Sequence, residues 1–297
     1  MTWATVFKSV LGPGCPAILA GITLATTLFA QSPQEPRTDL KEPVFRVAKQ
    51  PEGQPVATPA PAAQSEHPLI PAIQMADKAL GAIDATVKDY TCTLVKRELI
   101  DGTVNEHEYI FMKVRSQPFS VYMYFLGPKE IKGRECLWIA GANNGKLVGH
   151  EGGVKGKLLG THDLDPTGFL AMRGQRYPIT EIGVRNLTTK LLEVARNDVN
   201  FGECEVKFFK DAKVNGRTCT GLQVSHPVRR DNFRFHIAQI FIDDELQLPI
   251  RYASYDWPAA PGQAPQLLEE YTYLNMKVNP GLTDADFDRA NKDYGFQ

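Results

Sequence analysis

Five side chains that could do chemistry gather in a glycine-rich stretch near the middle of the chain. They are His150, Glu151, His162, Asp163 and Asp165. Histidines and carboxylates can ligate zinc or act as general acid and base. Their spacing follows no tight metal-ligand pattern, and glycines are frequent around them. We therefore favour a solvated, irregular stretch over residues 151–182, and keep a metal or hydrolytic site there as the alternative.

Other catalytic and cofactor patterns fail on their spacing. Two Gly-Lys pairs, at 145–146 and 156–157, lack the rest of a phosphate-binding loop. Ala140 and Glu151 stand where the first glycine belongs, and leucine follows both pairs. No G-x-S-x-G, H-E-x-x-H or C-x-x-C pattern occurs. The formal net charge of -1 does not favour nucleic acid. We expect no enzyme, no cofactor and no metal.

Two further sets of side chains have ordinary explanations. The acids at 243–245 fit a solvated hairpin turn better than a calcium loop, because spaced ligands are missing. Of the five cysteines, Cys15 lies in the N-terminal apolar segment. The other four are Cys92, Cys136, Cys204 and Cys219. They permit two disulfides in three pairings, with buried free thiols as the equal alternative.

The N-terminal part predicts export. Residues 1–30 resemble a secretory signal, with Lys8 before the apolar run 17–29. That run is shorter than the roughly 20 residues of a membrane-spanning helix, although an uncleaved anchor remains the alternative because Leu28 is large for a cleavage site. Residues 31–68 are rich in proline and alanine, which predicts a disordered linker.

Two helices and about ten strands are expected in the rest of the chain. Apolar residues recur at helical spacing over residues 68–88 and 180–195, with Thr180 as the expected N-cap of the second helix. Period-2 alternation predicts strands at 90–99, 106–115, 119–126, 133–140, 146–150, 203–210, 217–225, 234–242, 250–255 and 267–278. The polar end, 289–297, is expected to fray. The pattern indicates an α+β fold: a strongly curved antiparallel sheet with two long helices in or across its concave face.

The C-terminal strands carry a family resemblance. The positions concerned are Asp243, Leu248, Pro249, Asn279, Pro280, Asp286 and Phe287. The chain resembles the LolA-like sorters of outer-membrane lipoproteins in two features. One is a turn that begins with Asp and ends in Leu-Pro. The other is a strand that ends at Asn-Pro and is followed by an acidic residue and Phe. The sequence looks closest to an exported bacterial branch labelled as a domain of unknown function. The resemblance covers about 69–288 and implies a half-open β-barrel whose cavity takes a lipid.

The resemblance also implies candidate site residues. The inward-facing apolar set would be Ile110, Met112, Met123, Phe125, Ile240, Leu274 and Met276. Methionine suits an adaptable acyl-chain pocket, but an ordinary filled core explains the set as well. Tyrosines such as Tyr252, Tyr271 and Tyr273 would line the cavity or lie on an outer sheet face. Arg115 would contact the helical lid, although two residues separate it from Pro118 where the family has adjacent residues.

These observations lead to a hypothesis of function. We expect an exported, non-enzymatic carrier or sensor in the periplasm or cell envelope that binds a lipid or the acyl chains of a lipoprotein. Membrane contact would be transient unless residues 1–30 stay attached. The alternative is an envelope protein-interaction module with a filled core, which would use an exposed patch near Arg229 and Arg230. The third hypothesis is an enzyme that uses residues 150–165.

Overall fold

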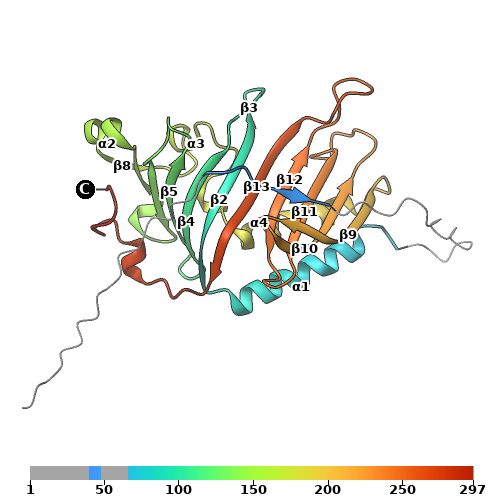
Figure 1. The fold of residues 1–297 in the computed structure, drawn as a ribbon, viewed down its shortest axis with the longest axis horizontal. Coiled ribbons are helices and arrows are strands. Elements are labelled where there is room, and N and C mark those ends of the chain that lie inside the picture. The colour runs from blue at the N-terminus through green and yellow to red at the C-terminus, as the bar shows by residue number, and fades with distance from the viewer. Residues whose placement is uncertain (1–39, 48–65, 297) are drawn as a thin grey trace, which may run out of the picture. The chain divides into compact units, whose positions relative to one another are not determined.

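The computed structural model describes residues 40–47 and 66–296, within the compact unit Leu40–Gln297. A single antiparallel sheet forms its frame (Figure 1). The strands are β1 (Phe45–Arg46), β2 (Asp89–Ile100), β3 (Thr103–Val104), β4 (Glu108–Arg115), β5 (Ser120–Gly127), β6 (Glu135–Ile139), β7 (Leu147–His150), β8 (Thr161–Leu164), β9 (Glu205–Val214), β10 (Arg217–Ser225), β11 (Ile237–Asp243), β12 (Pro249–Tyr255) and β13 (Leu267–Val278). The α-helices are α1 (Ile70–Thr86), α2 (Gly153–Leu159), α3 (Phe169–Met172) and α4 (Val184–Asp198), and the 3-10 turns are η1 (Asn143–Gly145), η2 (Ile179–Glu181) and η3 (Asp284–Phe287).

The strand order confirms the predicted curved antiparallel sheet. It runs β1-β9-β10-β11-β12-β13-β2-β4-β5-β6-β7-β8, with β3 beside β2. Two meanders, β9–β13 and β2–β8, are therefore joined by the pairing of β13 with β2. Within the described residues the outermost strands, β1 and β8, do not meet, so the sheet stays open. The predicted strands all occur, and the thirteen exceed the expected ten because β1, β3 and β8 are very short.

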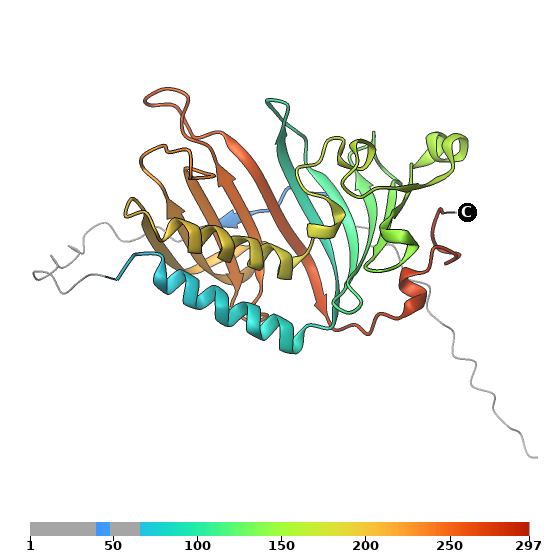
Figure 2. The same cartoon turned by 180° about the vertical axis from the view of Figure 1, so that it is seen from behind.

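The two long helices cover the concave face of the β9–β13 half. Figure 2 shows α1 and α4 side by side there, and Arg185 and Arg196 of α4 reach Asp84 and Asp77 of α1 at 2.5 Å. The prediction of Thr180 as a helix N-cap is wrong. Helix α4 begins after Gly183, whose φ of 108° disfavours any side chain, and residue 180 lies in η2.

Apolar side chains cover parts of both faces of the sheet, whereas period-2 alternation predicts one apolar face and one face toward water. On the inner face of the β2–β8 half, Val121 and Val114 belong to a buried apolar core. Beneath α1 and α4 a second core includes Leu222 and Ala238. On the outer face Phe241 and Ile250 form a smaller cluster, beside which Val47 packs. Both faces are thus covered, and the two halves differ mainly in what covers the inner face.

The two ends of the described chain differ from expectation. Residues 40–47, predicted as linker, add strand β1 to the edge of β9 and place Phe45 over the guanidinium of Arg251, 4.1 Å from the ring centroid. The tail predicted to fray is ordered to residue 296, because Tyr294 stacks on Tyr122 at 3.9 Å and buries its ring. Residues 1–30 and most of the predicted linker lie outside the described residues.

The glycine-rich middle is more regular than expected. It contains α2, β8 and α3, so the interpretation of residues 151–182 as an irregular stretch is wrong: β8 continues the ladder beside β7. The four cysteines outside the N-terminal segment are free thiols. Among the residues that the structure describes, no helix is long and apolar enough to cross a membrane.

Candidate functional site

A cavity of about 570 Å³ lies between α4, residues 175–183 and strands β2, β12 and β13. Its volume falls in the range of small-molecule sites, roughly 300–1,000 Å³. Helix α4 supplies an apolar wall through Leu187, Leu191 and Val194, which recur at steps of four and three residues, and polar side chains such as Asn186 and Lys190 flank this wall. Leu94 of β2 faces them from the sheet. We call this space the main cavity.

The floor of the main cavity carries buried charges. Glu98 of β2 and Glu269 of β13 stand directly opposite each other, 3% and 5% exposed. Two like charges on neighbouring strands repel each other, so both need cationic partners. Lys96 Nζ donates to Glu98 at 2.9 Å and to Gln175 at 2.7 Å. Arg176 Nε donates to Glu269 at 2.8 Å. The charges therefore neutralise one another within the floor.

Tyrosine hydroxyls complete the hydrogen bonding of these carboxylates. Tyr271 donates to Glu98 at 2.6 Å, and Tyr252 donates to Glu269 at 3.3 Å. Burial, reinforced by the charge of Glu269, raises the pKa of both hydroxyls well above the ordinary value, so both remain protonated donors. Tyr177 also donates to Glu269, at 3.2 Å. The floor thus presents hydrogen-bonding groups without a large net charge.

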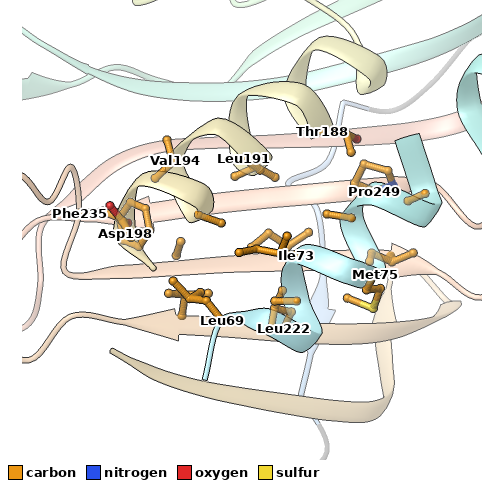
Figure 3. A pocket seen from close by; sticks show the side chains of 18 residues that line it. Leu69, Ile73, Met75, Thr188, Leu191, Val194, Asp198, Leu222, Phe235 and Pro249 are labelled. Atoms are coloured by element: carbon orange, nitrogen blue, oxygen red, sulfur yellow. The ribbon is translucent and has the colours of Figure 1, made fainter. Parts of the chain in front are cut away.

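A second, smaller cavity lies on the other side of α4. It measures about 70 Å³ and is enclosed by α1, α4 and strands of the β9–β13 half. Figure 3 shows Leu69, Ile73 and Leu222 converging on it from α1 and the sheet. Leu191 and Phe235 line both cavities. Val194 also lines both cavities, so these three side chains lie between them.

A family model identifies the chain at the level of its family. The model for DUF1571, a protein family of unknown function, matches residues 87–296. The chain belongs to the DUF1571 family. This match spans the sheet from the end of α1 to the buried C-terminal tail, and so includes the whole floor of the main cavity. No curated protein matches the sequence.

Solved structures give more distant likenesses to this DUF1571 chain. The Mycobacterium tuberculosis lipoprotein LppX matches at 12% identity and a TM-score of 0.41, over 74% of this chain and 100% of that one. A LolA superfamily protein from Nitrosomonas europaea matches at 10% and 0.28, over 72% and 97%. MucB, in a complex with MucA from Pseudomonas aeruginosa, matches at 15% and 0.41, over 73% and 60%. At such values the matches carry no superfamily, ligand or partner over to the DUF1571 chain.

The seven predicted cavity residues do not meet in one place. Ile110, Met112, Met123 and Phe125 are at most 4% exposed and pack into the apolar core of the β2–β8 half. Ile240 lines the smaller cavity. Leu274 and Met276 line neither cavity. The main cavity is lined instead by three of the tyrosines for which the sequence left two interpretations open, Tyr252, Tyr271 and Tyr273.

A bulge in β13 explains why strict alternation misplaces Leu274. The pairing of β13 with β2 shifts between Leu274 and Lys277, where Asn275 adopts a positive φ of 52°. An extra residue in one strand moves the following side chains to the other face. Met276 therefore packs against the inner core that Tyr273 also joins, while Leu274 belongs to neither inner cluster.

The remaining candidates lie outside the main cavity. Arg115 binds Asp284 at 2.6 Å and lies over the ring of Phe287, so it contacts the C-terminal turn η3. The carboxylates of the central stretch have separate partners: Glu151 pairs with Arg134 and Asp163 with Asn143. No group of three or more His, Cys, Asp or Glu among the described residues is arranged to hold a metal.

The sequence contained an overlooked signal for the floor. Lys96 and Glu98 continue the inward face of Cys92 and Leu94 in β2, and Glu269 continues the inward face of Tyr271 and Tyr273 in β13. The register therefore brings these charges and tyrosines onto one face. A search for apolar residues at every second position overlooks these side chains, because a charged residue at an inward position breaks the apolar pattern.

Proposed function

We propose that this protein is an exported, non-enzymatic carrier or sensor that binds an acylated, lipid-like molecule in the main cavity. The observation that carries the proposal is the combination of an apolar wall from α4 with a hydrogen-bonding floor of Glu98, Glu269 and tyrosines. A ligand with an apolar chain and a polar head complements both parts. The expected secretory signal in residues 1–30 supports a location in the periplasm or cell envelope.

The chain of the ligand supplies most of the binding energy. Each methylene group removed from water contributes about 0.8 kcal/mol, so a chain lying along Leu187 and Leu191 binds in proportion to its buried length. The conformational entropy that the acyl chain loses, together with the translational and rotational freedom that the ligand loses, opposes this gain. A lipid or the acyl chain of a lipoprotein meets this requirement equally.

The head of the ligand faces a floor whose charges are already paired. A charged head placed on the floor would have to compete for Arg176 or Lys96, leaving Glu269 or Glu98 buried without its full set of partners. An uncharged head with hydroxyl or ester groups exchanges hydrogen bonds with the floor and leaves the ion pairs intact. We therefore propose that the site prefers uncharged heads.

Calorimetry with two matched probes tests this function. Monodecanoylglycerol and decanoate share the same chain and differ in the head. We expect the glyceride to bind with one-to-one stoichiometry and more tightly than the carboxylate. If neither probe binds, the lipid-binding proposal fails, and a filled-core interaction module takes its place. If decanoate binds as tightly or more tightly, the cavity binds chains but our interpretation of its floor is wrong.

A further inference from the structure

Helix α2 exposes an unusual set of apolar side chains. Val154 and Leu158 are 83% exposed, and Leu159 is 54% exposed. Ten large hydrophobic side chains are exposed among the described residues, and five of them fall between residues 154 and 170. Phe169 and Leu170 of α3 supply the other two, at the same end of the sheet (Figure 1). Exposed apolar groups that cluster in this way mark an interaction surface.

Two glycines fix α2 so that its large side chains must point outward. A side chain at Gly152 would collide with the carbonyl oxygen of Lys132, and one at Gly156 with the carbonyl oxygen of Glu151 and the ring of His150. Gly156 is the one buried residue of α2, so the helix approaches the body most closely at a position where only glycine fits. Apolar side chains held outward by such packing are a feature of the fold and not a frayed end.

The charges on α2 indicate what it meets. Lys155 and Lys157 are exposed, and α2 contains no acidic residue. The nearest preceding acid, Glu151, pairs with Arg134 at 3.0 Å. A short helix that combines leucines with lysines suits the interface of a bilayer with anionic lipids, where the leucines enter the acyl boundary and the lysines meet head groups. We call residues 153–159 the α2 tip.

We propose that the α2 tip docks this protein on the surface of an anionic bilayer. A second copy of the chain is a poorer occupant, because a stable protein interface buries about 800 Å² on each partner, more than a seven-residue helix offers. The proposal does not depend on a ligand in the main cavity. Docking places the protein where acylated molecules reside, and salt weakens it because part of the attraction is electrostatic.

Vesicle flotation of the full chain tests the proposal, with vesicles of phosphatidylcholine alone and of an equimolar mixture with phosphatidylglycerol. We expect tight partition only into the mixed vesicles. The double variant K155Q/K157Q should partition about 30-fold more weakly, because each lysine contributes roughly a factor of five near an anionic surface. The double variant L158S/L159S should lose at least tenfold on the same vesicles. Val228→Ser, which also removes an exposed apolar group but outside the α2 tip, should leave partition unchanged.

A site-specific readout separates the tip from the N-terminal segment. In the variant Leu158→Trp, the new indole should be quenched by brominated lipid in mixed vesicles, beyond the quenching of the unaltered chain. Absence of this extra quenching, or equal partition of the tip variants and the unaltered chain, overturns the proposal. So does sedimentation showing that the tip variants convert a dimer to monomers, since the tip would then cover a second copy.

Discussion

Filling the main cavity from α4 is the sharpest perturbation of the proposed lipid site. Leu187 is half-buried and lines the cavity opposite the sheet. Leu187→Trp keeps the wall apolar but extends an indole into the space. If the ring displaces about three methylene groups of a bound chain, at about 0.8 kcal/mol each, binding weakens by about 2.4 kcal/mol. That loss corresponds to a roughly 50-fold higher Kd.

Calorimetric titration with monodecanoylglycerol measures this change. The matched control is Leu170→Trp, which makes the same substitution at a side chain 67% exposed on α3 and should leave Kd unchanged. Overpacking near the helix could cost about 1–3 kcal/mol of stability, so urea unfolding of both variants accompanies the titration. A folded Leu187→Trp protein that binds the glyceride as tightly as the unaltered chain would refute the placement of the acyl chain along α4.

Three further predictions concern the stability of the frame. Tyr294→Ala should lower the free energy of unfolding by about 3 kcal/mol in urea titrations, because it removes a buried, stacked ring from the outer face; a loss below about 1 kcal/mol would mean that the tail contributes little. Arg251→Met should cost about 3 kcal/mol by the same measurement, since it leaves the buried carboxylate of Glu270 short of a partner, and a more stable variant would contradict this. Burial alone would raise the pKa of Asp243, but hydrogen bonds from Arg217 and two backbone N–H groups outweigh it and the pKa is lowered. The resulting stabilisation is complete above the unfolded pKa of about 3.9 and is lost as pH falls through the folded pKa. The difference in free energy of unfolding between the unaltered protein and Asp243→Asn should therefore shrink on acidification. A difference that is independent of pH would contradict the ion pair.

The sheet was predictable where one local rule operates throughout a strand. In β4 and β5 every second residue is apolar, and the structure buries those residues, including Met112 and Val121, on one face. The β11–β13 meander was also predictable, because its strands are neighbours in sequence and are joined by segments rich in turn-forming residues.

The errors arose where long-range contacts decide the outcome. The bulge at Asn275 leaves no apolar signature, so Leu274 was assigned to the wrong face. The polar tail conceals Tyr294 and Phe296, whose cluster partners Tyr122, Leu137 and Val148 lie far away in sequence. The floor of the main cavity could not be predicted for a related reason. Glu98 can be buried because Lys96 and Tyr271 donate hydrogen bonds to its carboxylate, and the sequence of β2 alone does not reveal the partner from β13.

Native mass spectrometry of residues 31–297, followed by organic extraction of whatever co-purifies, tests the central claim most directly. The proposed function predicts one equivalent of an acylated molecule with an uncharged head, lost in Leu187→Trp and retained in Leu170→Trp. A mass equal to that of the polypeptide alone, with no uptake of added monodecanoylglycerol, would contradict the claim that the main cavity is a lipid site.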